Sequence, residues 1–259
     1  MSGKVTLPAL QRMKEDRQKI VGIVVYDCQM AQIADRAGVE IVSVGDSVGV
    51  NLWGHANELE VTLEQMLLLC QAVRCGVTRA LVSCDIPAAA LDGGGAVDAV
   101  VHAAARLVRE GGADLVKLDV HRSSPDAVRA VSRAGMPVWA QFGDERAAPM
   151  ANRLVGEAKA LEDAGASMLD FRHSGPVAGP DVVRAVRIPV LGGLGGGPWL
   201  DGRIRSLVHA IGYLASALDV RADRYANVAQ TALTAIEALR DDVRAGRHIR
   251  GTAPAPANS

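Results

Sequence analysis

The stretch ALEDAGASMLDFR, residues 160–172, carries the pattern that decides the fold. A helical segment with polar and apolar positions leads to Gly165, and the apolar run SMLDF follows at once. A glycine at this point suits a helix C-cap, because that position favours a backbone with positive φ. A short apolar run without regular polar alternation is typical of a buried parallel strand. The stretch therefore predicts a helix–glycine–strand unit.

The same pattern recurs along the chain. It is found in IADRAGVEIVSVGD at 33–46, RLVREGGADLVKLD at 106–119 and VSRAGMPVWAQFG at 131–143. Further apolar runs predict strands at 20–25, 80–84, 188–192 and 207–211. Seven or eight such units in a chain of 259 residues predict a (β/α)8 TIM barrel. A doubly wound open sheet is the alternative.

Helix starts are also marked in the sequence. Thr62 and Gln65 have the spacing of a capping box, and the prolines of Ser124-Pro125 and Pro180-Asp181 suit a first helical turn. Since no linker-like composition divides the chain, we predict a single barrel domain over residues 1–248, with N-terminal and C-terminal helices, the latter near 222–245. The Pro-rich and Ala-rich segment 249–259 predicts a disordered tail.

Composition narrows the function classes. The formal net charge of −1 provides no field to attract nucleic acid or an anionic membrane, so neither is an expected partner. The four cysteines, Cys28, Cys70, Cys75 and Cys84, lack metal-ligand spacing and indicate a reducing compartment. No signal-like segment and no apolar run of about 18 residues is found. We therefore predict a cytoplasmic protein.

Charged residues collect at the ends of the predicted strands, where (β/α)8 barrels carry their functional groups. They are Asp46, Asp85, Lys117, Asp119, Asp170 and Arg172. Lys117 and Asp119 share one strand face, as do Asp170 and Arg172, because each pair is two residues apart. For each acid, a helix N-cap or a surface position is the alternative interpretation. Carboxylates that converge in a barrel mouth need a cation, and oxygen ligands suit Mg2+.

A 2-oxo acid is a natural substrate for such a site, since its carboxylate and keto oxygens chelate a metal. The metal would then act as a Lewis acid on the keto oxygen and stabilise an enolate after deprotonation at C3.

Several segments resemble the ketopantoate hydroxymethyltransferase family. They are KIVGIVVYD at 19–27, VEIVSVGDSVG at 39–49, WGHANELEVTLEQM at 53–66, ARLVREGGADLVKLD at 105–119, DRYANV at 223–228 and DDVRAGR at 241–247. The resemblance implies a barrel of the phosphoenolpyruvate/pyruvate superfamily and a decameric homo-oligomer. It also implies hydroxymethyl transfer from 5,10-methylenetetrahydrofolate to a branched 2-oxo acid, with Mg2+ in the site.

The resemblance further assigns roles to individual residues. The metal ligands fall on Asp46 and Asp85, which also face the substrate, and on Asp119, which replaces the usual Glu. Ser47 and Lys117 match the residues that hold the carboxylate and keto end of the substrate, although a structural ion pair of Lys117 with Asp119 is an alternative. Gln141 stands where the family has a substrate-facing His.

The predicted strand end at 170–173 departs from the family. Arg172 occupies the position of the catalytic Glu, and an arginine stays protonated and cannot act as a base. One hypothesis makes Asp170 or His173 the base, although Asp170 could instead pair with Arg172 and His173 could cap a turn. In a second, Arg172 binds a second carboxylate or a phosphate, and the reaction is another metal-enolate step such as a retro-aldol cleavage or a decarboxylation.

A third hypothesis is that the protein is a non-catalytic relative of the family, retained for binding or assembly. The predicted function is Mg2+-dependent, aldol-type hydroxymethyl transfer to C3 of a 2-oxo acid with an altered base, and the other two readings remain alternatives.

Overall fold

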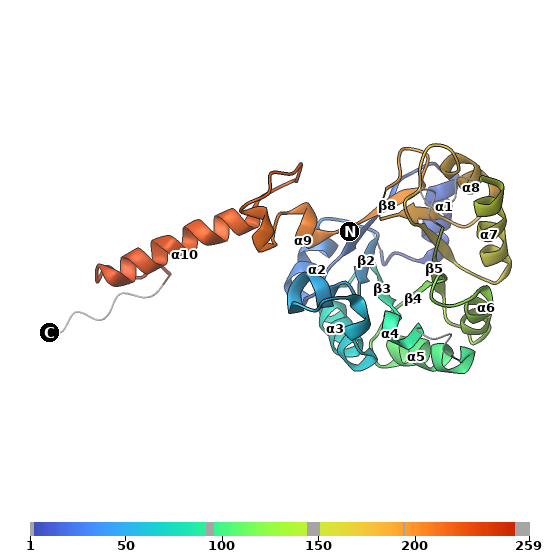
Figure 1. Cartoon of the computed structure of the whole chain (residues 1–259), viewed down its shortest axis with the longest axis horizontal. Coiled ribbons are helices and arrows are strands. Elements are labelled where there is room, and N and C mark those ends of the chain that lie inside the picture. The colour runs from blue at the N-terminus through green and yellow to red at the C-terminus, as the bar shows by residue number, and fades with distance from the viewer. Residues whose placement is uncertain (1–2, 92–95, 144–150, 194, 252–259) are drawn as a thin grey trace. The chain divides into compact units, whose positions relative to one another are not determined.

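The computed structural model describes residues 3–91, 96–143, 151–193 and 195–251 (Figure 1). The chain divides into two compact units, Met1–Ser206 and Leu207–Ser259. The single domain predicted over residues 1–248 stays a prediction, and residues 252–259 of the predicted tail lie outside the described residues.

The first unit is a closed barrel of parallel strands in which each strand pairs with the next and β8 pairs with β1. The strands are β1 (Ile20–Val24), β2 (Ile41–Val44), β3 (Leu81–Asp85), β4 (Leu115–Asp119), β5 (Val138–Phe142), β6 (Met168–Phe171), β7 (Val190–Gly192) and β8 (Gly202–Ser206). The (β/α)8 barrel predicted from the sequence is confirmed, and the doubly wound sheet is excluded because the sheet closes.

Helices alternate with the strands and surround the barrel (Figure 1). The described α-helices of this unit are α1 (Leu7–Glu15), α2 (Cys28–Arg36), α3 (Leu63–Gly76), α4 (Ala88–Leu91), α5 (Val97–Arg109), α6 (Pro125–Arg133), α7 (Ala151–Asp163) and α8 (Gly179–Ala185), with a π-helical segment η1 (Gly49–Trp53) and a 3-10 helix η2 (Glu58–Glu60). The Thr62–Gln65 capping box is present, and Gly165 ends its helix with a φ of 97°. Local signals in the sequence thus predicted where α3 begins and where the helix before β6 ends.

One predicted strand is wrong. The run at 207–211 begins with the short helix α9 (Leu207–Ala210), and the eighth strand lies just before it, at Gly202–Ser206. In β8, Arg203 and Arg205 are exposed whereas Ile204 is buried. Buried parallel strands usually form continuous apolar runs. Because β8 alternates between exposed and buried residues instead, a search for such runs does not find it.

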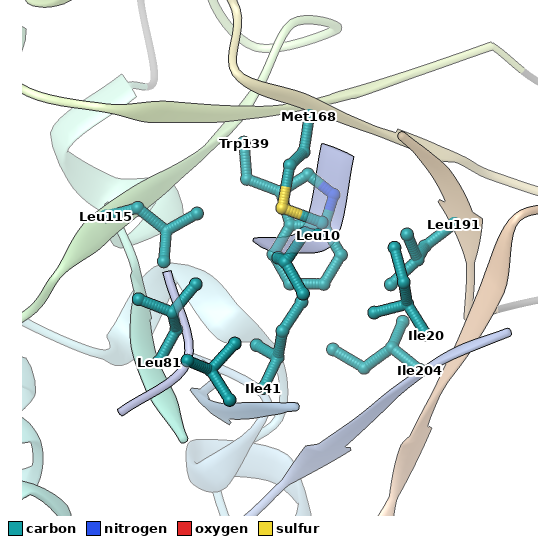
Figure 2. Close-up of a cluster of buried hydrophobic side chains, with 10 residues drawn as sticks. Leu10, Ile20, Ile41, Leu81, Leu115, Trp139, Met168, Leu191 and Ile204 are labelled. Carbon is teal, nitrogen blue, oxygen red and sulfur yellow. The ribbon is translucent and has the colours of Figure 1, made fainter. Parts of the chain in front are cut away.

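The N-terminal end of the barrel interior is filled by apolar side chains, most of them contributed by the first residues of the strands (Figure 2). The members are Val5, Leu10, Ile20, Ile41, Leu81, Leu115, Trp139, Met168, Leu191 and Ile204. We call this set the apolar floor. Leu10 of α1 is fully buried at its centre, so α1 closes the barrel from below. Apart from the buried indole N–H of Trp139, the side chains of the floor carry no hydrogen-bonding N–H or O–H group.

The second unit contains α9, the short turn η3 (Ala215–Ala217) and α10 (Val228–Arg244). The Asn227 side chain accepts a 3.0 Å hydrogen bond from the Gln230 N–H and so caps α10, which therefore begins later than the helix predicted near 222–245. Among the described residues, no helix is long and apolar enough to cross a membrane.

Because Leu10 is the buried centre of the apolar floor, Leu10→Ala should lower the free energy of unfolding by about 2–5 kcal/mol. Urea denaturation monitored by circular dichroism measures this change. Arg12→Ala, at an exposed position of the same helix, is the matched control and should change it by less than about 0.5 kcal/mol. Equal losses in the two variants would mean that α1 does not close the barrel.

Candidate active site

On five strands, the inward-facing residue two positions after the apolar floor is polar. Inward positions recur every second residue along a strand. The polar positions are Ser43, Ser83, Lys117, Gln141 and Asp170, each two residues after a member of the floor. One further inward step brings Asp85, Asp119 and Arg172 to the C-terminal end of the barrel. The fold thus places polar and charged groups directly above the apolar floor.

A buried ion pair joins two strands across β5. The Lys117 Nζ donates to Asp170 Oδ2 at 2.8 Å, and the two side chains are only 12% and 3% exposed. The Gln141 Nε2 donates to the same oxygen at 3.0 Å. The ammonium also lies 5.5 Å from the centre of the Trp139 ring, which is within the range of a cation–π contact.

The other oxygen of Asp170 is different. Asp170 Oδ1 is buried and has no hydrogen-bond partner. Buried polar atoms are nearly always satisfied, so an orphaned carboxylate oxygen needs an explanation. An oxygen that no protein donor occupies is available to a proton or to a ligand.

Asp46 and Asp85 lie together at the ends of β2 and β3. The Asp46 backbone N–H donates to the Asp85 carboxylate, and the Ala88 N–H at the start of α4 donates to Asp46 Oδ2 at 3.1 Å. Asp85 Oδ1 is buried without a partner. The two loops therefore hold each other in place and leave one carboxylate oxygen unbound.

These carboxyl groups are hard to ionise. Burial raises the pKa of Asp85 to about 7, with the charges of Asp46 and Asp170 adding to the rise and Lys117 opposing it. Burial also raises the pKa of Asp46, and nearby Glu58 adds to that rise. A bound cation would offset this penalty, because it favours the charged form of both groups.

The pKa of Lys117 is also raised, but for a lysine this favours the charged form. Burial acts to lower it, but the negative charges of Asp170 and Asp85 outweigh burial and hold the pKa above its usual value. Lys117 is therefore a permanent ammonium at the centre of the site.

Ser47 lies beside the same two loops. Its hydroxyl is 3.0 Å from the Tyr26 hydroxyl, which accepts a 2.8 Å hydrogen bond from the Asn51 side chain. A Cβ on Gly45 would lie 3.0 Å from Ser47 Oγ and 3.6 Å from Asp85 Oδ2. Glycine thus keeps open the space between the serine and the aspartate.

Arg172 and Asp119 meet at the mouth of the barrel. The Arg172 Nη1 lies 3.5 Å from Asp119 Oδ2, and the Arg122 Nε lies 4.0 Å from the same oxygen. The His121 backbone N–H binds the other oxygen of Asp119 at 2.9 Å. Arg172 Nε is buried and has no partner. The contact with Asp119 is therefore a long one and leaves part of the guanidinium group unsatisfied.

His173 lies beyond the end of β6, in a turn where its φ is 48°. This left-handed conformation is uncommon for a non-glycine residue. Because the strand has ended, strand alternation no longer decides which way the imidazole points.

The structure pairs the charges across strands rather than along them. The sequence suggested Lys117 with Asp119 and Asp170 with Arg172 as the structural alternatives, whereas Lys117 binds Asp170 and Arg172 contacts Asp119. Residues two apart on a strand are roughly 6–7 Å apart, so side chains from β4 and β6 that converge inside the barrel meet more closely.

The three predicted metal aspartates are not brought into one cluster. Within residues 3–91, 96–143, 151–193 and 195–251, no group of three or more His, Cys, Asp or Glu side chains is placed to hold a metal. Asp119 faces two arginines instead. An aspartate is one methylene shorter than a glutamate, which limits its reach toward Asp46 and Asp85.

Sequence reasoning missed the supporting residues of the site. Tyr26 and Asn51 hold Ser47, Trp139 lies under Lys117, and Glu58 raises the pKa of Asp46. Tyr26 follows β1 directly, and its position at a strand end was the signal that could have marked it.

The pKa of Asp85 predicts how stability depends on pH. Its value of about 7 in the folded state exceeds that of an unfolded chain, about 3.9. The stability that the neutral carboxyl allows is fully present below about pH 4 and is lost as the pH rises through about 7. Asp85→Asn should therefore be more stable than the wild type at pH 8, by up to about 4 kcal/mol.

Urea denaturation at pH 4 and pH 8 in EDTA tests this expectation. The difference between Asp85→Asn and wild type should vanish at pH 4. Asp126→Asn, at an exposed carboxylate of α6, serves as the control and should match the wild type at both values. A wild type that is as stable as Asp85→Asn at pH 8 would contradict the raised pKa.

Known proteins resemble this chain along most of its length. A protein 31% identical over 258 residues is the 3-methyl-2-oxobutanoate hydroxymethyltransferase of Moorella thermoacetica, with 94% of this chain and 95% of that protein covered. The barrel also resembles two solved structures. One is 2,3-dimethylmalate lyase of the PEP mutase/isocitrate lyase superfamily, with a TM-score of 0.63, 18% identity and coverage of 97% and 91%. The other is phosphonopyruvate hydrolase in complex with oxalate and Mg2+, with a TM-score of 0.61, 14% identity and coverage of 97% and 92%.

The family model described as ketopantoate hydroxymethyltransferase matches residues 4–248. The match spans every strand of the barrel and includes Asp46, Asp85 and Lys117. The chain therefore belongs to the ketopantoate hydroxymethyltransferase family of enzymes.

Proposed function

We propose that this enzyme catalyses a metal-dependent, aldol-type addition at C3 of a 2-oxo acid, with hydroxymethyl transfer as its reaction. The observation that carries the proposal is the convergence of Asp46, Asp85 and Lys117 over the apolar floor in a member of this family. Two acidic groups suited to a cation and one permanent ammonium are what a chelating 2-oxo acid requires.

Asp46 and Asp85 would hold the metal, with Mg2+ as the first candidate. The unpartnered Asp85 Oδ1 and its raised pKa fit a cation, and Mg2+ typically takes only one or two protein carboxylates. The binding of Mg2+ by phosphonopyruvate hydrolase, which shares the fold, supports this choice. When bound, the metal supplies Lewis acidity toward the keto oxygen. Asp119 is left out, because it faces Arg172.

Lys117 would bind the oxygens of the substrate. An ammonium group has three donors, and Asp170 Oδ2 accepts one of them. The others are available to a carboxylate or to the oxygen that becomes negative in the enolate. In this low-dielectric interior such a fixed charge stabilises developing negative charge strongly. The Ser47 hydroxyl, beside Asp85, would orient the carboxylate of the substrate.

Asp170 would take the proton from C3. Arg172 cannot do so, and Asp170 Oδ1 is an unoccupied carboxylate oxygen one inward step below it. Lys117 and Gln141 fix the other oxygen and so orient the carboxylate. A metal held by Asp46 and Asp85 would acidify C3 for this transfer. His173 is the alternative base.

The resemblance to the family alone supports 5,10-methylenetetrahydrofolate as the one-carbon donor. It also supports a cytoplasmic homo-oligomer, decameric in form. Exposed apolar side chains on α10, among them Ile236 and Val243, are compatible with an interface between copies.

A different metal-enolate reaction is the second candidate. The guanidinium group of Arg172 at the mouth favours a larger substrate with two anionic groups, on which a retro-aldol lyase or a decarboxylase could act.

Metal-dependent exchange of C3 protons tests the proposal. In deuterated water, 2-oxoisovalerate and 2-oxobutyrate should lose C3 protons in the presence of enzyme and Mg2+, measured by proton NMR. Asp46→Ala should lower the rate by a factor of 100 or more, whereas Asp126→Asn should retain it. Absence of exchange with these acids and with the dicarboxylate 2-oxoglutarate would refute the proposed chemistry, and full activity of Asp46→Ala would refute the metal site.

The base is tested separately. Asp170→Asn keeps the shape of the side chain and an oxygen for Lys117, so it should bind the substrate but lower the exchange rate at saturation by about 100-fold or more. His173→Gln should change the rate less than threefold. Equal and small losses in both variants would show that another group removes the proton. Asp170→Asn combined with Arg172→Glu, which restores the family's base, should recover exchange.

A further inference from the structure

The guanidinium group of Arg172 is poorly satisfied where it stands. Its Nη1 reaches Asp119 Oδ2 only at 3.5 Å, and its Nε is buried without a partner. The side chain is 32% exposed, so the group lies at the surface of the mouth while one donor is covered by protein. A covered donor with no acceptor destabilises the protein, because it has lost its water and gained nothing in return.

The backbone around Arg172 holds this arrangement. The Arg172 N–H donates to the Phe142 carbonyl at 3.0 Å and continues the pairing of β6 with β5. By alternation from Met168 and Asp170, the Arg172 side chain extends from the inward face of the barrel. Immediately after it the chain turns at His173. The guanidinium group is therefore presented over the buried polar layer rather than to the outside of the barrel.

The structure already shows what kind of group this place accepts. Asp119 puts a carboxylate against Arg172, with Arg122 4.0 Å from the same oxygen. The long distances show that the carboxylate of Asp119 does not engage the guanidinium fork in the usual two-bond manner. The His121 N–H holds the other oxygen of Asp119 and limits how far the side chain can move toward Arg172. A free carboxylate would meet no such restraint.

We infer that Arg172 binds a second carboxylate of the substrate, so that the enzyme acts on dicarboxylic 2-oxo acids. This inference rests on the proposed function, in which Asp46, Asp85 and Lys117 receive the 2-oxo acid end. The second carboxylate accepts hydrogen bonds from Arg172 at the β6 side of the mouth, across the barrel from β2 and β3. Arg172 thus selects substrates with a second negative charge, at the position where the family places a base.

Paired substrates test the inference. The first measurement is kcat/KM for C3 exchange with 2-oxoglutarate, which has a second carboxylate, and with 2-oxobutyrate, which does not. Wild type should prefer 2-oxoglutarate by about tenfold or more, and Arg172→Gln should remove that preference. Arg129→Gln, at an arginine of α6 outside the mouth, is the control and should keep the wild-type ratio.

Binding gives a second readout that does not depend on turnover. In calorimetric titration with Mg2+, 2-oxoglutarate should bind the wild type about tenfold more tightly than 2-oxobutyrate, and Arg172→Gln should bind both alike. Asp119→Asn removes the competing carboxylate and should keep or increase the preference for 2-oxoglutarate. If Arg172→Gln does not fold, Arg172→Lys, which keeps the charge but loses the fork, should lower the preference.

The outcomes separate the two proposals. If neither of these acids nor 2-oxoisovalerate exchanges, the proposed function fails. If both exchange but wild type shows no preference, or Arg172→Gln keeps the preference, the proposed function stands and the role of Arg172 in binding a dicarboxylate is overturned. A loss of preference in Asp119→Asn as large as in Arg172→Gln would likewise overturn it, because the two residues would then form a structural pair.

Discussion

The buried ion pair between Lys117 and Asp170 is the interaction on which the rest of the site depends. Removing one partner of such a pair leaves a charge in a low-dielectric interior, which typically costs 3–5 kcal/mol. The apolar floor lies directly beneath the pair and offers no counter-charge, so Lys117 depends on Asp170, its hydrogen-bonded partner, and on the nearby charge of Asp85. Asp85, Gln141 and Trp139 are then arranged around a fixed ammonium group rather than around a mobile one.

This arrangement leaves some oxygens without partners. Asp85 Oδ1 and Asp170 Oδ1 are both buried and unbonded, and both belong to groups that interact with Lys117. A protein selected only for stability would satisfy or remove such atoms. Two unsatisfied carboxylate oxygens above a dry base are instead typical of a site that is completed by a ligand, with one oxygen suited to a cation and the other to a proton.

The barrel could be predicted from the sequence because its signals are local. The glycine at each helix end, the capping box at Thr62 and the apolar runs all act within a few residues, and closure of the sheet follows from their repetition. The eighth strand was missed where this logic fails, since its two arginines are exposed and Ile204 is its only buried apolar side chain. The identity of the strand-end residues was likewise readable. Their ion-pair partners could not be predicted, because the contacts of Lys117 with Asp170 and of Asp119 with Arg172 join side chains from β4 and β6, which are not neighbouring strands.

The two contacts between β4 and β6, Lys117 with Asp170 and Asp119 with Arg172, also link the departures from the family to one another. With an arginine at position 172, a carboxylate is no longer available there to face the substrate. The chain has a carboxylate one step lower, at Asp170, where it neutralises Lys117, and the shorter acid at Asp119 now faces the arginine. A single Arg172→Glu exchange would therefore remove the guanidinium group that faces Asp119 and add a third acid beside Asp119 and Asp170, with only Lys117 and Arg122 to balance the three. In this chain the charges at positions 119, 170 and 172 are therefore balanced together with that of Lys117.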